Sequence, residues 1–386
     1  MSMQKLSATK RKQKLAEIYQ ALNSDPVDIP ALRKHAISPG GLIQDEVRRK
    51  AWPKLLNVNV FDAVMRPGDL HLHKDYQQVL LDVNRSARRF PKSMPADQRE
   101  ILQNQMLDVI VWVLTEHSEL HYYQGYHDIC ITFLLVCGQK LTYRLINKLS
   151  THHLRDFMDP TMDKTRHILN YLIPIVRKSN GELADYLVRS GVGTIFALSW
   201  LITWYGHVLS NSKHTLRLYD FFLASHPLMP IYLAAQIVLH RKEEVLKQEC
   251  DMALMHHLLS NLPQNLPFED IIVAAVDLFA QFPPESIAKD AALYYHKSLA
   301  ITKFRDFELA GYQQRPDFIL KERKLRQQNE FRKLLATKSS KITEGNRGNR
   351  ARRWTIWAIS GALGAAAIAM TNVSLEWATE VIGFLP

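Results

Sequence analysis

Helical spacing of the apolar residues dominates this chain between residues 41 and 302 and limits most strongly what it can fold into. The segment 99–114 shows the pattern, with an apolar stripe formed by Leu102, Met106, Val109 and Val113. Apolar residues three and four positions apart lie on one face of a helix. No run alternates apolar and polar residues between hairpin turns, and no βαβ rhythm is visible. The sequence therefore predicts an all-α, multi-helix fold.

The composition supports a folded chain with several parts. At 386 residues, 47% hydrophobic and 23% charged, the chain is long and apolar enough to bury a core. Its patterns predict an N-terminal helical lead-in at 1–38 and a large helical domain at 39–302. A basic linker, partly helical and partly flexible, is expected at 303–353, followed by a membrane anchor and short tail at 354–386.

The net charge of +11 invites a nucleic-acid interpretation, but most of it is concentrated in one segment. Residues 321–353 contain twelve Lys or Arg and three Asp or Glu, directly before an apolar stretch. No groove-reading motif or interleaved aromatic pattern accompanies them, so no nucleic-acid partner is expected. Two interpretations stay open for 321–353: contact with anionic lipid headgroups, or a solvated basic helix.

The stretch 354–370 is the expected membrane anchor. Its 17 residues carry no charge and would span about 26 Å as a helix, near the lower limit for a hydrocarbon core. Trp354 and Trp357 fit one interface, and four arginines precede them. The positive-inside rule keeps the preceding domain in the cytosol. A buried core helix is the alternative. A second apolar stretch, 222–239, is interrupted by prolines and is expected to be a core helix.

Cysteine and histidine give no metal-binding pattern. Three cysteines, Cys130, Cys137 and Cys250, are expected to be buried, reduced thiols on the cytosolic side of a membrane. The pair His152–His153 lacks zinc-ligand spacing, and so does His256–His257. Both pairs are expected on helix surfaces, and no metal site is predicted.

The run "VLLDVNRSARRF", residues 79–90, is the first of two candidate functional segments. As a helix it turns Val79, Val83 and Phe90 toward a core. Asp82, Arg85 and Arg89 then share a neighbouring face, at positions i, i+3 and i+7. Either a solvated surface ion pair or an arginine presented to a partner fits this pattern.

The run "HYYQGYHDI", residues 121–129, is the second segment. Tyrosines surround Gln124, and Gly125 suits a bend or a close approach of another backbone. Asp128 falls in the first turn of the apolar helix that follows, where a carboxylate favours the helix dipole. The run reads either as a helix start with aromatic anchors or as an amide held rigidly at a groove.

An arginine and a glutamine together have a specific chemical meaning. GTP hydrolysis needs charge stabilised on the transferred phosphoryl group and an attacking water held in line, tasks that these two side chains perform. The chain has no phosphate-binding loop. We therefore expect no cofactor of its own, and GTP and Mg²⁺ would be held by a partner GTPase.

Three motifs in order resemble the TBC domain, the Rab GTPase-activating domain. "VLLDVNR" (79–85) resembles its IxxDxxR motif, "YYQG" (122–125) its YxQ motif, and "RRKAW" (48–52) its earlier RxxxW motif. A later segment, Arg217 to Asp220, resembles the family's Arg-hydrophobic-aromatic-Asp sequence. The resemblance covers about residues 40–290.

The resemblance implies a role for each motif residue. Arg85 would be an arginine finger and Gln124 a glutamine finger that replaces the Rab's own glutamine. Asp82 would orient the arginine helix, and Tyr122 would pack the glutamine loop beside Gly125. The supporting residues expected elsewhere are Asp128, Arg48 and Trp52. The chain departs from the usual family pattern at Tyr126 and His127.

A hydrophobic segment after the TBC domain is similar to the arrangement in an endoplasmic-reticulum-anchored member of the family. That similarity implies the endoplasmic reticulum membrane, or the Golgi, and the Rab that controls transport between them. A non-catalytic, membrane-anchored Rab-binding adaptor is the alternative function.

Overall fold

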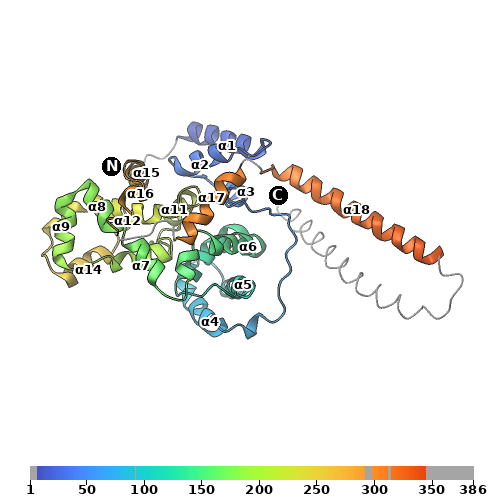
Figure 1. Ribbon diagram of the computed structural model, residues 1–386, viewed down its shortest axis with the longest axis horizontal. Helices are drawn as coiled ribbons and strands as arrows, with labels where there is room; N and C mark the ends of the chain where they lie inside the picture. Colours follow the sequence, from blue (N-terminus) through green and yellow to red (C-terminus); the bar gives the residue numbers. More distant parts are fainter. Residues whose placement is uncertain (1–6, 92, 292–297, 312–313, 345–386) are drawn as a thin grey trace. The chain divides into compact units, whose positions relative to one another are not determined.

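A computed structural model describes residues 7–91, 93–291, 298–311 and 314–344 (Figure 1). Within these ranges the regular structure is helical and contains no strand, which confirms the all-α prediction. The α-helices are α1 (Ala8–Asn23), α2 (Ile29–Ile37), α3 (Asp45–Leu55), α4 (Tyr76–Arg85), α5 (Ala96–Glu116), α6 (Tyr126–Thr151), α7 (Asp163–Leu169), α8 (Leu172–Ser179), α9 (Gly181–Ser190), α10 (Leu198–Ile202), α11 (Ser212–Leu223), α12 (Met229–His240), α13 (Lys242–Lys247), α14 (Met252–Ser260), α15 (Phe268–Gln281), α16 (Pro284–Ile287), α17 (Leu299–Gly311) and α18 (Asp317–Glu344). The short 3₁₀ helices are η1 (Leu70–Leu72), η2 (Ser86–Arg89), η3 (Arg155–Met158) and η4 (Ile195–Ala197).

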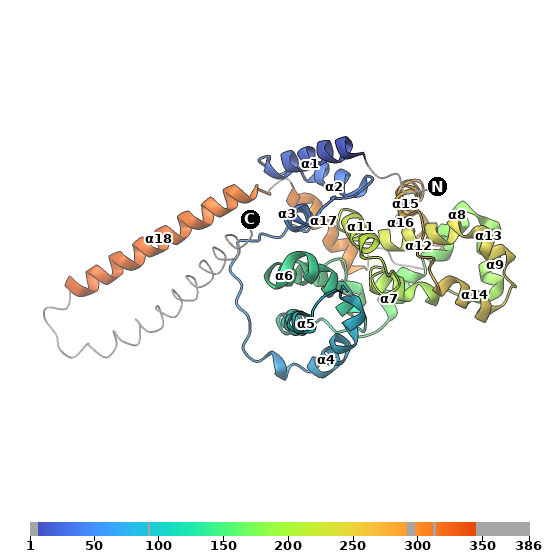
Figure 2. The ribbon, with the colours of Figure 1, turned by 180° about the vertical axis from the view of Figure 1, so that it is seen from behind.

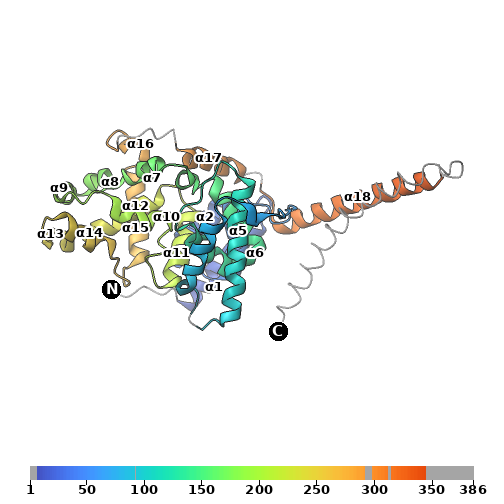
Figure 3. The same cartoon turned by 90° about the horizontal axis from the view of Figure 1, so that it is seen from below.

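Helix α6 is the central element of the first half of the domain. It packs along α5, as Figures 2 and 3 show, and also contacts α3 and α4. Phe133 of α6 lies 5.0 Å from the Trp52 ring of α3 and 5.3 Å from the Tyr219 ring of α11. Edge-on and tilted aromatic contacts of this kind add stability beyond the burial of their area. They join three segments that are far apart in the sequence.

Helix α6 is also the one helix among the described residues long and apolar enough to cross a membrane. Most of its apolar window is buried inside the domain, and Gly138 interrupts its helical backbone. Such burial is the property of a core helix. The predicted anchor at 354–370 lies outside the described residues.

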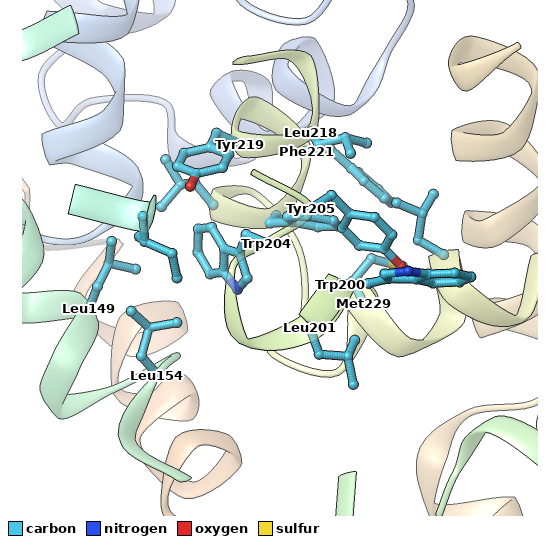
Figure 4. Packing of buried hydrophobic residues seen from close by; sticks show 14 of the residues in the cluster. Leu149, Leu154, Trp200, Leu201, Trp204, Tyr205, Leu218, Tyr219, Phe221 and Met229 are labelled. Carbon is cyan, nitrogen blue, oxygen red and sulfur yellow. The ribbon is translucent and has the colours of Figure 1, made fainter. Parts of the chain in front are cut away.

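Aromatic residues around α10 and α11 form a second part of the core (Figure 4). Trp204 and Tyr205 follow α10, are buried, and have positive φ angles of 46° and 63°. Bulky residues rarely adopt this left-handed conformation, which costs of order 1–3 kcal/mol each. Trp204 contacts Tyr219 and Phe222, with ring centres 5.4 and 5.5 Å away. This packing holds the turn after α10 in one conformation.

The compact unit is longer at both ends than the predicted 39–302. It covers residues 1–320. At the N-terminus, Ile18 of α1 and Leu32 of α2 are fully buried in the core. At the C-terminus, α17 crosses residue 302 and buries Phe304 and Phe307. The expected lead-in and the first part of the expected linker, residues 303–320, therefore belong to the compact unit.

Polar contacts close the end of this unit. The Lys54 ammonium donates to the Arg315 carbonyl over 3.1 Å and lies 2.5 Å from an Asp317 carboxylate oxygen. The Gln314 amide donates to the Lys54 carbonyl over 2.8 Å, and the Arg315 guanidinium donates to Asp25 over 2.6 Å. These contacts tie residues 314–317 to α3 and to the segment between α1 and α2.

The prediction that His152 and His153 lie on a helix surface is wrong. Both are buried, and His152 stacks on Phe307 of α17 with ring centres 4.6 Å apart. Burial and the charges of Lys148 and Lys303 lower the pKa of His152 to about 3. The pair is covered by α17, most of which lies in the segment expected to be a linker.

The expectation of buried cysteines holds for Cys130 but is wrong for Cys250, which is exposed.

Residues from 321 onward form a separate unit. Its described part is the basic continuation of α18, where Leu325, Phe331 and Leu334 are exposed among lysines and arginines. The helical part of the basic segment thus presents both apolar and cationic side chains.

Candidate functional site

Helix α4 holds the arginine of the first candidate segment at its last turn. Val79 and Val83 are buried and fix the helix against the core. The side chain of Asp82 is 1% exposed, whereas that of Arg85 is 69% exposed. The Arg85 Nη1 atom lies 3.7 Å from Asp82 Oδ1. Helix α4 therefore exposes the Arg85 guanidinium to solvent, while the neighbouring Asp82 carboxylate is buried.

The second candidate segment is a turn that leads into α6. Gln124 is exposed, while Gly125 next to it is buried and has a φ of 112°. A Cβ atom on Gly125 would lie only 3.0 Å from Thr203 Cγ2. Both the conformation and the close approach thus require glycine at this position. The turn holds the Gln124 amide on the surface above a tightly packed backbone.

Tyrosine side chains fix this turn from below. The ring of Tyr126 lies 5.6 Å from that of Tyr123 and 6.3 Å from that of Tyr122. The Tyr123 hydroxyl donates to the Ile202 carbonyl over 3.0 Å. Burial raises the pKa of both Tyr123 and Tyr126 well above the usual value, so both stay protonated.

A hydrogen bond joins the two candidate segments. The Tyr122 hydroxyl donates to Asp82 Oδ2 over 3.0 Å. The same hydroxyl lies 3.2 Å from Nδ1 of His127, in the first turn of α6. Burial and the neighbouring Asp82 raise the pKa of Tyr122, so its hydroxyl keeps the proton that it donates. The structure thus brings Asp82, which lies 3.7 Å from Arg85, into contact with Tyr122, two residues before Gln124.

The turn after α10 is a third element of the site, and sequence reasoning missed it. His207 Nδ1 lies 3.0 Å from Asp128 Oδ2, and Arg89 Nε lies 3.1 Å from Asp128 Oδ1. A Cβ atom on Gly206 would lie 3.0 Å from Arg89 Nη2. The sequence "WYGH" contains the glycine that permits this approach, but nothing in it indicates what lies opposite.

Asp128 is the charged centre of this third element. Burial alone would raise its pKa, but the hydrogen bond with His207 and the charges of His127 and Arg89 outweigh burial. The pKa of Asp128 therefore lies below the usual range, and the group is a carboxylate at neutral pH. Asp128 was predicted to favour the helix dipole of α6, and it also holds Arg89 and His207 against that helix.

Arg48 and Trp52 of α3 lie away from these turns and brace the domain. Asp220 of α11 accepts hydrogen bonds from Arg48 Nη2 over 2.9 Å and from Trp52 Nε1 over 2.9 Å. It also accepts from the Leu42 backbone over 2.9 Å. Burial alone would lower the pKa of Arg48, but the Asp220 charge outweighs burial and raises it.

Arg217 extends the brace from the same helix. It donates to both carboxylate oxygens of Glu269 and to the carbonyls of Ala36 and Ile37. The contacts connect α2, α11 and α15 through one side chain. The first and last residues of this motif, Arg217 and Asp220, thus each connect several segments of the domain.

The structure separates Arg85 from its arginine neighbours. Arg89 is engaged by Asp128, and it also lies 3.5 Å from the Leu209 carbonyl. The side chain of Arg88 is not among those described. Across the described residues, no cluster of three or more His, Cys, Asp or Glu side chains is arranged to hold a metal ion. Chemically, the site offers an exposed guanidinium and an exposed carboxamide on two segments joined by a partly buried hydrogen bond.

Comparisons with known proteins agree with this arrangement. Residues 45–246 match the family model described as "Rab-GTPase-TBC domain". The chain is 57% identical over 376 residues to "TBC1 domain family member 20" from Homo sapiens and from Bos taurus, covering 96% of this chain and 92% of each relative. It is 30% identical over 275 residues to "GTPase-activating protein gyp10" from Schizosaccharomyces pombe, covering 70% of this chain and 72% of that protein.

Two solved structures share the fold. The crystal structure of the Ypt/Rab-GAP domain of Gyp1p has a TM-score of 0.53 at 14% identity, covering 70% of this chain and 98% of that one. The crystal structure of the Chlamydomonas flagellar RabGAP TBC domain has a TM-score of 0.52 at 12% identity, with 72% and 97% covered.

Proposed function

Because this chain belongs to the Rab-GTPase-TBC domain family and is a Rab GTPase-activating protein, we propose that Arg85 and Gln124 are the two side chains that accelerate GTP hydrolysis. A Rab bound to GTP and Mg²⁺ docks on the helical domain. The Arg85 guanidinium stabilises negative charge on the transferred phosphoryl group. The Gln124 carboxamide orients the attacking water, a task that the Rab's own glutamine performs in the unassisted reaction.

The hydrogen bond from Tyr122 to Asp82 is the observation that carries this proposal. It connects the base of the arginine helix to the base of the glutamine turn, so both exposed groups reach one partner surface. A pre-arranged pair of this kind lowers the barrier without reorganisation at the moment of reaction. An arginine supplied in trans accelerates hydrolysis by roughly 10³–10⁵.

Single-turnover GTP hydrolysis by a panel of Rabs tests the proposal. The full chain in detergent micelles is compared with its Arg85→Ala and Gln124→Ala variants. We expect one or a few Rabs to be accelerated by about a thousandfold or more, and each variant to lose most of that acceleration. Arg166→Ala is the control, because Arg166 is equally exposed but lies on α7, away from both segments. If a Rab binds and the parent chain does not accelerate its GTP hydrolysis, the adaptor function replaces this proposal.

The membrane proposal rests on the sequence after the compact unit. We propose that residues 354–370 anchor the chain in the endoplasmic reticulum membrane, with the domain in the cytosol. The substrate would be the Rab of endoplasmic-reticulum-to-Golgi transport. Rabs carry lipid anchors, so placing both proteins in one membrane raises their effective concentration.

Residues 321–353 would lie against anionic headgroups. The helical part of this segment exposes Leu325, Phe331 and Leu334 together with lysines and arginines, a combination that suits a membrane surface. Each well-placed cation would contribute about 1 kcal/mol.

A further inference from the structure

We propose that His127 is a positioning residue for the GTPase-activating site, because its Nδ1–H group directs the Tyr122 hydroxyl proton toward Asp82 beneath Arg85. The inference rests on the proposed roles of Arg85 and Gln124. The proposed role of His127 requires no contact with nucleotide or Rab. It acts through the polar chain that connects the glutamine turn to the arginine helix.

The direction of the hydrogen bonds follows from counting protons. The Tyr122 hydroxyl has one proton, and it donates that proton to Asp82 Oδ2 over 3.0 Å. It therefore has none to give to His127 Nδ1, which lies 3.2 Å away. The contact is a hydrogen bond only if Nδ1 carries the proton and the tyrosine oxygen accepts it. The geometry thus assigns the Nδ1–H tautomer to His127.

The surroundings of His127 keep the ring in place and favour its neutral form. Its side chain is 12% exposed, and Nε2 lies 3.8 Å from Asp128 Oδ2, beyond hydrogen-bond distance. Burial lowers the pKa of His127, partly opposed by the charges of Asp128 and Asp82 and assisted by those of His207 and Arg89. These groups face the ring from α4, η2, α6 itself and the turn after α10.

The consequence for catalysis is geometric. Without a donor at His127 Nδ1, the Tyr122 hydroxyl loses its second partner and Asp82 is held less firmly. The Arg85 side chain is then less restricted, since its Nη1 lies 3.7 Å from Asp82 Oδ1. A misplacement of about 1 Å in a catalytic group costs on the order of a hundredfold in rate. Rab docking uses the domain surface and is largely unaffected by such a change.

Two substitutions separate hydrogen bonding from packing. His127→Leu fills a comparable space and removes the donor. His127→Asn places its amide nitrogen two bonds from Cβ, the same separation as Nδ1, and so retains a donor toward Tyr122. Tyr122→Phe removes the hydroxyl at the centre of the chain.

The experiment measures kcat and KM for GTP hydrolysis by a Rab, stimulated by the full chain in detergent micelles. We expect His127→Leu and Tyr122→Phe each to lower kcat roughly tenfold or more, with KM changed less than about twofold. His127→Asn should restore kcat to within about threefold of the parent. Adding His127→Leu to Tyr122→Phe should not lower kcat further, because both substitutions break the same series of hydrogen bonds.

A spectroscopic measurement on the parent protein tests the proposed tautomer independently of catalytic activity. Histidine-selective ¹⁵N NMR reads which ring nitrogen carries the proton, and the His127→Asn spectrum assigns the signal. We expect the Nδ1–H tautomer at neutral pH. Observation of Nε2–H, or an unchanged kcat for His127→Leu, overturns the inference.

The inference and the proposed function fail in different ways. If Arg85→Ala abolishes acceleration while His127→Leu keeps full kcat, the two-finger site stands and the positioning role is rejected. If the parent accelerates no Rab in the panel, the proposed function is rejected, and the positioning role with it.

Discussion

Arg48 and Asp220 lie 172 residues apart in the chain and form a buried ion pair, with Nη2 and Oδ2 separated by 2.9 Å. The Asp220 side chain is fully buried and also binds Trp52 and the Leu42 backbone. Removing one partner of such a pair leaves a charge without compensation in the core. This ion pair therefore couples the packing of α3 to that of α11.

Arg48→Met should strongly destabilise the compact unit. We expect the free energy of unfolding to fall by about 3–5 kcal/mol, since Asp220 would remain buried without its cation. Urea denaturation of residues 1–320, followed by circular dichroism, measures the change. Arg166→Met is the matched control, because the Arg166 pair with Asp163 is exposed and 3.9 Å apart. We expect the control to remain within about 0.5 kcal/mol of the parent. Equal effects of the two substitutions would contradict the bracing role.

Gly125→Ala should impair the glutamine turn more than the domain as a whole. A methyl group at φ 112° would lie 3.0 Å from Thr203 Cγ2, so the turn must shift and carry Gln124 with it. We expect the stimulated rate of GTP hydrolysis by the Rab to fall at least about tenfold. Gly181→Ala provides the comparison, since a Cβ atom there meets nothing within 4 Å. Full activity of Gly125→Ala would show that the turn tolerates movement.

The buried His152 should make the domain sensitive to mild acid. Its pKa is lowered from 6.5 in the unfolded chain to about 3 in the fold, chiefly by burial. Between these values the unfolded chain binds a proton that the folded chain does not. The free energy of unfolding should therefore decrease as pH falls from about 6.5 toward 3.

His152→Phe tests this dependence. Phenylalanine keeps a ring against Phe307 and cannot be protonated, so the variant should lose stability less steeply below pH 6.5. Denaturation midpoints measured from pH 7 to pH 4 report the slope. His256→Phe changes an exposed histidine on α14 and should retain the parent's slope. Identical slopes for all three proteins would exclude His152 as a source of acid sensitivity.

Membrane attachment should depend on the segment after residue 344. We expect the full chain to co-sediment with phospholipid vesicles after high-salt washing, and a chain ending at residue 344 to be released. Both forms should stimulate a soluble Rab within about twofold of each other. On vesicles that carry a lipidated Rab, the full chain should be faster, because both proteins share one surface. Salt-resistant vesicle binding by the shorter chain would place the attachment elsewhere.

The sequence predicted the elements of this fold better than their burial. Apolar spacing identified the helical class, and the motifs placed Arg85 on a helix and Gln124 at a bend. The helix expected over 79–90 nevertheless ends at Arg85 and continues as a 3₁₀ turn, which directs Arg89 to Asp128. The sequence did not predict that α17 covers His152. A short amphipathic helix in the expected basic linker has the same residue pattern whether it packs on the domain or stays free. Neither did it find His207, whose role depends on Asp128 in a distant helix. Contacts between residues so far apart in the sequence form only in the folded chain, so no local sequence pattern reveals them.

The separation between α3 and α11 along the chain has a consequence for the order of folding. Ribosomes release the N-terminal end first, so Trp52 emerges 168 residues before the carboxylate that it binds. The segments that carry Arg85 and Gln124 also emerge before Asp220, and before the turn at residues 203–207. Nascent chains that already display both motifs therefore lack the groups that hold them in place. The ability to stimulate a GTPase should appear late in synthesis, when the last helices close over the first.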